Sequence, residues 1–145
     1  MPGIVVGIDG SHNASNALDW AMAEAAIRKA QLTVLTVLAL PASYWSGRPA
    51  PLPGDDERVA EIRKSAEAAV EAAAAKLGSG RPESVTVTAL SGYPAQALVD
   101  AAKDSDLLVV GARGGGGFGS LVLGSVSNQV VHHASCPVVV VPPSK

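Results

Sequence analysis

The sequence predicts an α/β protein: a parallel β-sheet with helices on both faces. Runs rich in β-branched apolar residues alternate with segments whose apolar residues recur at helical spacing, and this alternation implies right-handed crossovers between parallel strands. Hydrophobic residues make up 48% of the chain but aromatic residues only 3%, which favours small-faced helices packed closely on such a sheet. The 145 residues suffice for one core but hardly for two. We therefore expect residues 1–145 to form a single domain.

Five apolar runs are expected to be strands because they are short, rich in Val, Ile and Leu, and bounded by polar or turn-forming residues. They are Ile4 to Ile8, Leu32 to Leu40, Val85 to Leu90, Leu107 to Val110, and Val138 to Val141. The third alternates Val and Thr, as a half-exposed edge strand does. The last has neither a polar residue nor a charge that would discourage pairing, so its edge should be covered.

Four helices are expected between these strands. The first carries apolar residues from Ala14 to Ala25 at i, i+3, i+4 spacing, with Ser11 or Asn13 as N-cap. The second carries a longer stripe from Val59 to Leu77, and Gly78 is its stop signal.

The third helix should begin at Pro94, a residue suited to the first helical turn. Its inward residues are expected to be Ala97, Leu98, Ala101 and Ala102. The fourth should run from about Ser125 to His132.

Charge and composition argue against several classes of partner and location. The formal net charge is −2 and Lys and Arg form no cluster, so the basic surface of a protein that binds nucleic acid or a membrane is missing. The single cysteine, Cys136, cannot form an internal disulfide, and no secretory signal opens the chain. No apolar run approaches the roughly 20 residues that span a bilayer. We expect a soluble cytoplasmic protein.

The segment from Leu107 to Ser125 is the strongest functional signal. A buried-strand pattern ends at Gly111 and leads into a glycine-dense loop that reaches Gly124-Ser125 at a helix start. Glycines let backbone N–H groups approach an anion closely, and a helix N-terminus adds unpaired donors and a positive dipole end. This pattern predicts a phosphate site built from loop amides and the hydroxyls of Ser125 and Ser127.

Asp9 is the expected partner of this loop. It ends the first strand as Gly111 ends the fourth, and ligands of open α/β sheets bind where neighbouring connections leave strand ends in opposite directions. A carboxylate facing phosphate directly would be repelled, so Asp9 should contact ribose hydroxyls or hold Mg²⁺ that bridges to phosphate oxygens.

The spacing Gly111-x2-Gly114-x9-Gly124-Ser125 is neither a Rossmann fingerprint, which would follow the first strand, nor a P-loop, because Gly-Lys-Ser/Thr is absent. Together with three further segments it closely resembles the ATP-binding branch of the universal stress protein family. These are Val5-Val6-Gly7-Ile8-Asp9-Gly10-Ser11, Leu123-Gly124-Ser125-Val126-Ser127 and Cys136-Pro137-Val138-Val139-Val140-Val141.

The resemblance implies strand order 3-2-1-4-5, an adenine nucleotide alpha hydrolase-like fold, and ATP with Mg²⁺ bound across strands one and four. Asp9 resembles the family's acidic residue near ribose and metal, and Val37 resembles the residue whose backbone binds adenine. Gly111 would lie against ribose, and Arg113 would pair with a terminal phosphate. Gly7 falls where relatives line the adenine pocket, sometimes with a larger residue. The implied nucleotide-binding set is Gly7, Ile8, Asp9, Val37, Val110, Gly111, Arg113, Gly114, Gly124, Ser125, Val126 and Ser127.

The family likeness implies a dimeric, nucleotide-binding regulator of the stress response, in which the strand Val138 to Val141 pairs with its twin. Two alternatives remain: a slow ATP hydrolase, and a sensor of AMP or cyclic AMP. Hydrolysis needs a group that positions water near the γ-phosphate, and no carboxylate or Gln is evident beside the loop, so any turnover should be feeble. The protein partner cannot be named from the sequence.

Three other features have a functional and a plainer interpretation. The proline-rich segment from Pro41 to Asp56 is either a lid or a surface loop, and its Tyr44 and Trp45 either stack on adenine or cover the sheet, covering being favoured. His132, His133 and Cys136 lack an evident fourth metal ligand, and Cys136 before Pro137 fits a packed strand entry better.

Overall fold

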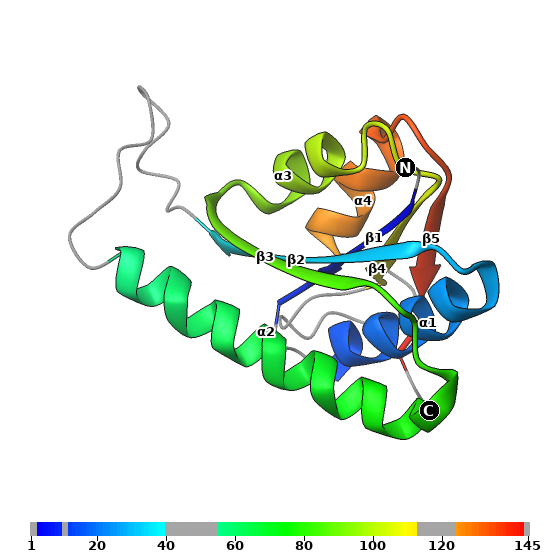
Figure 1. Ribbon diagram of the computed structural model, residues 1–145. Helices are drawn as coiled ribbons and strands as arrows, with labels where there is room; N and C mark the ends of the chain where they lie inside the picture. Colours follow the sequence, from blue (N-terminus) through cyan, green and yellow to red (C-terminus); the bar gives the residue numbers. More distant parts are fainter. Residues whose placement is uncertain (1–2, 10–11, 40–54, 113–123, 144–145) are drawn as a thin grey trace, which may run out of the picture.

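The computed structural model describes residues 3–9, 12–39, 55–112 and 124–143. Its centre is a five-stranded parallel sheet in the order β3-β2-β1-β4-β5 (Figure 1). The strands are β1 (Gly3–Ile8), β2 (Gln31–Ala39), β3 (Val85–Gly92), β4 (Leu107–Gly111) and β5 (Val138–Val141). Both the fold class and the strand order expected from the sequence are confirmed.

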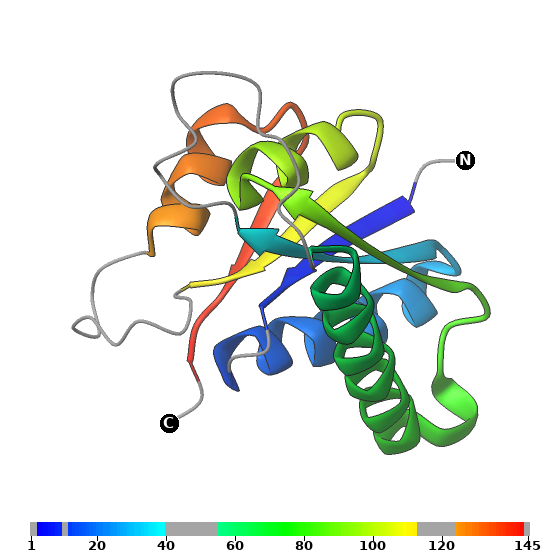
Figure 2. The same cartoon turned by 90° about the vertical axis from the view of Figure 1, so that its left-hand side faces the viewer.

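Two helices cover each face of the sheet. Helices α1 (His12–Arg28) and α2 (Asp55–Leu77) lie on one face, and α3 (Pro94–Ala101) and α4 (Ser125–His133) on the other (Figures 1 and 2). The connection after β1 therefore leaves toward the first face, and the connection after β4 leaves toward the second. Among the described residues, no helix is both long and apolar enough to cross a membrane.

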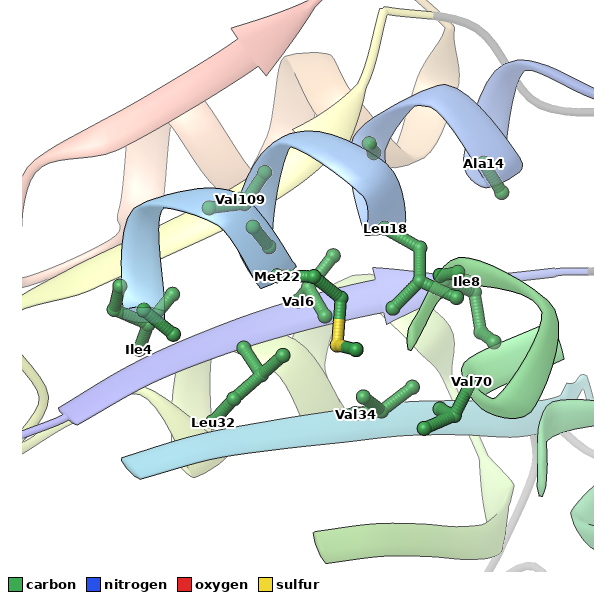
Figure 3. Close-up of a cluster of buried hydrophobic side chains, with 14 of the residues drawn as sticks. Ile4, Val6, Ile8, Ala14, Leu18, Met22, Leu32, Val34, Val70 and Val109 are labelled. Carbon is green, nitrogen blue, oxygen red and sulfur yellow. The ribbon is translucent and has the colours of Figure 1, made fainter. Parts of the chain in front are cut away.

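The larger core lies between the sheet and helices α1 and α2. Leu18 and Met22 of α1 pack over Val6 of β1 and Val34 of β2, with Val70 of α2 beside them (Figure 3). These side chains alternate with residues that face the other side of each strand, as period-two strands require. Burial of each large side chain contributes about 1.5–3 kcal/mol, so this layer holds α1 and α2 to the sheet.

The smaller core lies under α3 and α4. Val5, Leu108 and Val110 supply the sheet side, and Leu98 and Val130 the helix side. Both faces of β1 and β4 are thus buried, which explains their nearly uninterrupted apolar sequences.

Several element boundaries differ from the sequence-based expectation. Asn13 lies inside α1, so it is not the N-cap, and Ser11 lies outside the described residues. Helix α2 begins at Asp55, so the last two residues of the expected irregular segment are helical. As expected, α2 stops before Gly78, whose φ of +54° favours glycine, and the 3₁₀ turn η2 (Gly78–Gly80) follows.

Ala101 was expected to face inward and is exposed. The buried stripe of this segment is Ala95, Leu98 and Ala102, at spacings of three and four. At about 100° per residue, Ala101 lies roughly 90° from the middle of that stripe. The expectation failed because it placed the stripe too far around the helix.

The two edge strands of the sheet, β3 and β5, differ in the charged groups placed beside them. At the β3 edge, the Arg63 guanidinium of α2 donates to the carbonyl oxygen of Val87 at 3.4 Å, and β3 alternates Val and Thr. The β5 edge is formed by Val138–Val141, all of which are half-buried. Charged side chains over a strand edge are a common defence against unwanted pairing, and β5 itself carries none.

Candidate nucleotide-binding site

The strands β1 and β4 separate at their carboxyl ends. Their ladder ends at the pair Val6–Val109, although β1 continues to Ile8 and β4 to Gly111. On their outer sides both strands remain paired, Ile8 with Thr36 of β2 and Gly111 with Val141 of β5. The parting of β1 and β4, with connections that leave to opposite faces, creates the switch point at which open α/β sheets bind ligands.

Asp9 follows β1 directly at this parting, and its side chain is exposed. Val37 lies on the neighbouring strand, one residue beyond Thr36, the last β2 residue paired with β1. Its side chain is half-buried and packs at the rim of the core beneath α3 and α4. Asp9 and Val37 therefore lie at the carboxyl ends of adjacent strands, at the same end of the sheet as Gly111.

Helix α4 begins beside the same carboxyl edge of the sheet, and no side chain of the described residues caps its first turn. Gly124 is its N-cap, with extended backbone (φ −66°, ψ 164°) and no side-chain cap. The first intrahelical bond is that of the Asn128 amide to the Gly124 carbonyl, at 2.9 Å. The amides of Ser125, Val126 and Ser127 precede that bond, and the first N–H groups of a helix have no intrahelical acceptor. Three backbone donors and the positive dipole end thus gather at exposed Ser125.

A set of hydrogen bonds holds the two ends of the glycine-rich segment together. The Gly124 amide donates to the Ala112 carbonyl at 2.7 Å, and the Ala112 amide donates to the Val141 carbonyl at 2.8 Å. Ser127 is 3% exposed, and its hydroxyl donates toward the same Ala112 oxygen at 2.8 Å and toward the Gly124 oxygen at 3.1 Å. We call this group, Ala112, Gly124 and Ser127, the neck of the segment.

The neck changes the role assigned to the Ser127 hydroxyl. From the sequence we expected that hydroxyl to donate to phosphate, yet a hydroxyl has one proton and both acceptors beside it are backbone carbonyls. The side chain of Ser127 therefore fixes the start of α4 against the end of β4. Its backbone amide keeps the position expected for a phosphate donor.

Gly7 is one of the expected site residues, and its lack of a side chain is also needed for packing against α3. A Cβ at Gly7 would lie 2.6 Å from Cδ2 and 2.9 Å from Cδ1 of Leu98, closer than real contacts allow. The space in which relatives were expected to hold a larger residue is filled here by α3. The side chains of Ile8 and Val110 are also buried, in the larger and the smaller core respectively.

Arg113 and Gly114 lie outside the described residues, as do Tyr44, Trp45 and most of the expected lid, residues 41–54. The expected roles of these residues stay predictions. Val126, half-buried, packs at the rim of the smaller core, so its side chain supports α4 while its amide is one of the three first-turn amides without an intrahelical acceptor.

Metal ligands do not cluster within the described part of the chain, where no group of three or more His, Cys, Asp or Glu side chains is found. His132 Nδ1 lies 2.8 Å from the Asn128 carbonyl oxygen of its own helix. Cys136 packs at the rim of the smaller core. Burial raises the pKa of its thiol, and the Asp106 carboxylate raises it further. A raised pKa keeps the thiol protonated and poorly reactive.

Comparison with known proteins identifies the family. Residues 2–142 match the model of the universal stress protein family. The chain belongs to the universal stress protein family. A universal stress protein of Mycolicibacterium smegmatis is 34% identical over 139 residues, which are 96% of this chain and 47% of that protein. The chain thus spans about half the length of the curated relatives it matches.

Solved universal stress proteins share this fold. The structure of UspA from Lactobacillus plantarum has a TM-score of 0.73 and 26% identity, with 97% of each chain covered. A universal stress protein in complex with cAMP has a TM-score of 0.69 and 27% identity, covering 99% of this chain and 98% of its own. These likenesses agree with the adenine nucleotide alpha hydrolase-like strand order expected from the sequence.

Proposed function

We propose that this universal stress protein binds an adenine nucleotide, ATP with Mg²⁺, at the parted carboxyl ends of β1 and β4, and acts as a dimeric regulator. The observation that carries the proposal is the ladder that stops at Val6–Val109 while both strands continue. The solved relative in complex with cAMP, 27% identical, supports an adenine nucleotide as the ligand. The expected site residues beyond the described part of the chain, Arg113 and Gly114, would complete the phosphate contacts.

Each proposed contact uses a group whose chemistry fits it. The open first turn of α4 offers backbone donors to phosphate, which a helix N-terminus binds readily. Asp9 offers a carboxylate oxygen, and Mg²⁺ commonly takes one or two carboxylates together with substrate phosphates and water. Val37 offers its backbone to the adenine edge from the neighbouring strand. Asp9 would thereby face the metal or the ribose hydroxyls rather than phosphate.

Dimerisation through β5 belongs to the same proposal. The β5 edge carries four half-buried valines, and an isologous pairing about a twofold axis would cover it. Nucleotide that stabilises one arrangement of the segment next to α4 would then act on a partner protein through the dimer.

The deciding measurement is the thermal unfolding of the full chain with and without ATP and Mg²⁺. A ligand that binds the native form at a hundred times its Kd adds about 2.7 kcal/mol of stability, which raises the Tm by several degrees for a chain of this size. GTP at the same concentration is the control for base selectivity. No shift with any adenine nucleotide, together with no nucleotide released from the purified protein in its mass spectrum, would overturn the proposal.

A second candidate is a sensor of AMP or cyclic AMP, favoured by the cAMP complex of the 27%-identical relative. Competition separates the two: labelled ATP displaced by cAMP at a hundredfold lower concentration than by ATP itself would assign the sensor function. Slow ATP hydrolysis is checked in the same preparation. Phosphate release that is lost in Asp9→Ala belongs to this protein, and release that persists unchanged comes from a contaminant.

A further inference from the structure

The large apolar side chains that the described residues leave exposed are four: Trp20, Ile27, Tyr93 and Val131. Two of them, Trp20 on α1 and Val131 on α4, belong to the helices that lie on opposite faces of the sheet next to β5 (Figures 1 and 2). Scattered single apolar residues on a surface need no explanation. A pair placed on both sides of an open strand edge does.

The position of Trp20 on α1 follows from its neighbours. Asp19 binds Lys76 of α2 at 2.8 Å, which marks the side of α1 that faces α2. The buried stripe containing Ala17, Leu18 and Ala21 faces the sheet. At about 100° per residue, Trp20 lies on the shoulder opposite Asp19. Since α1 contacts α2 on one side and reaches β5 on the other, Trp20 faces the β5 side.

The position of Val131 on α4 follows from the handedness of the fold. Buried Ser127 and Val130 mark the side of α4 that faces the sheet. Helix α4 lies beside α3 (Figure 2), and the crossover from β4 through α4 to β5 is of the right-handed type that parallel strands adopt. In that arrangement the residue after Val130, turned by about 100° in a right-handed helix, faces away from α3. Val131, 44% exposed, therefore faces the β5 edge.

Among the described residues β5 pairs with β4 alone, and the outer side of its backbone lies between these two residues. The Leu108 amide binds the Pro137 carbonyl at 3.0 Å and the Ala112 amide binds the Val141 carbonyl at 2.8 Å. Because backbone groups alternate in direction along a strand, Pro137, Val139 and Val141 face β4. The amide and carbonyl groups of Val138 and Val140 consequently face outward.

A four-residue strand is only about 13 Å long at roughly 3.3 Å per residue, whereas a stable interface takes about 800 Å² from each partner. Pairing of β5 alone falls well short of that area. Any dimer formed at this edge must also bury surface on the flanking helices, and Trp20 and Val131 are the large apolar groups that those helices turn toward it.

We infer that Trp20 and Val131 are anchor residues of the dimer, buried by a second copy of this chain on the two faces of a continuous sheet. The inference rests on the β5 dimer of the proposed function and assigns its contacts. Antiparallel pairing of β5 with its twin places the twofold axis perpendicular to the sheet. Both copies of α1, with Trp20, then lie on one face, and both copies of α4, with Val131, lie on the other.

The test compares three charged substitutions by sedimentation velocity of the full chain over a range of concentrations. Trp20→Glu and Val131→Glu each place a carboxylate in the apolar contact, and we expect each to weaken dimerisation at least tenfold. Tyr93→Glu is the matched control, because Tyr93 is 38% exposed and follows β3 at the opposite edge of the sheet, so this change should leave the dimer constant unchanged. Circular dichroism melting verifies that each variant is folded.

Two further measurements test the dimer contact without a charged substitution in it. In a Trp45→Phe background Trp20 is the only tryptophan, so its emission should shift to longer wavelength as the dimer dissociates on dilution. Val140→Pro removes an amide that faces outward while it leaves the bonds to β4, and should give a folded monomer.

The outcomes distinguish the inference from the proposed function beneath it. A wild-type chain that is monomeric at every concentration overturns both. A dimer that Val140→Pro abolishes, but that Trp20→Glu and Val131→Glu leave intact with constant Trp20 emission, keeps β5 pairing and overturns the anchors. Equal weakening by Tyr93→Glu also overturns the anchors, because the effect would then come from the added charge and not from its position.

Discussion

The hydroxyl of Ser127 lies 2.8 Å from the carbonyl oxygen of Ala112, so the first turn of α4 is tied to the end of β4. The Gly124 amide reaches the same oxygen at 2.7 Å. This one carbonyl thereby fixes where the glycine-rich segment leaves the sheet and where it returns. The first-turn amides of α4 are held at the carboxyl edge as a result.

Replacing Ser127 by Ala should lower the free energy of unfolding by about 1–2 kcal/mol, the usual cost of a lost hydrogen bond at a buried site. It should also weaken ATP binding, because the donors at the α4 N-terminus lose one of their ties to β4. Urea unfolding and calorimetric titration measure the two effects. Ser135→Ala is the matched control, since that hydroxyl makes only a long, exposed contact of 3.4 Å to Lys103. Equal stability of the two variants would contradict a structural role for the neck.

Gly7→Ala should destabilise the fold by about 1–3 kcal/mol, the usual cost of overpacking a core, because the new Cβ meets Leu98 at 2.6 Å. The same change at Gly80, where no atom lies within 4 Å of the added Cβ, should be nearly neutral. In a double-mutant cycle, Gly7→Ala should cost less when Leu98 is already Ala. Additive costs in that cycle would mean that the two positions do not compete for one space.

The sequence predicts features that a local pattern of residues encodes. It does not predict single contacts between residues far apart along the chain. The strands were predictable as short runs of β-branched apolar residues, the helices because their apolar residues repeat at a period of 3.6, and the strand order followed from the family likeness. The contact between Gly7 and Leu98 and the bonding of Ser127 join residues 91 and 15 positions apart along the chain. No periodic pattern encodes them. The one available signal for Ser127 was its spacing of two residues after Ser125, which turns the two serines to opposite sides of a helix.

The candidate site was likewise only partly predictable from the sequence. Asp9 and Gly111 could be placed together because the carboxyl ends of neighbouring parallel strands share one edge. The early end of the β1–β4 ladder at Val6–Val109 could not be foreseen, because strand separation depends on the twist of the whole sheet.

Ser125→Glu should separate anion binding from helix stability. A carboxylate at the first helical position interacts favourably with the helix dipole by about 0.3–1 kcal/mol, so the unliganded protein should melt no lower than wild type. The same charge should repel the phosphates of ATP and weaken binding at least tenfold. Gln129→Glu, an exposed change one turn further along α4, is the control and should bind normally. Unchanged ATP affinity in Ser125→Glu would remove the α4 N-terminus from the proposed site.

Cys136 should react slowly with iodoacetamide at neutral pH. Burial, and then the Asp106 carboxylate, raise the pKa of the thiol, whereas the unfolded chain has the ordinary value of about 8.5. Rates measured from pH 7 to 10 should therefore rise later for the native protein than for the protein in urea. Asp106→Asn should shift the native profile only part of the way back, because burial is the larger cause. Coincident native and denatured profiles would contradict the raised pKa.

The same shift predicts the direction of a pH effect on stability. A raised native pKa means that the unfolded chain loses the thiol proton first, so stability falls as pH rises from about 8.5 through the native value. Cys136→Ser should lack this component of the alkaline loss. Urea unfolding at pH 7.5 and 9.5 measures it.

The guanidinium of Arg63 on the Val87 carbonyl leaves the sheet with two unlike ends. A sheet that offered bare edges on both sides would let molecules join end over end, each addition exposing another place to attach. In the proposed dimer, the second copy paired at β5 would bring its own β3 strand, with Arg63 over its edge, to the far side. Growth of the sheet by edge pairing would then stop at two copies, although the edge strand β5 is all valine.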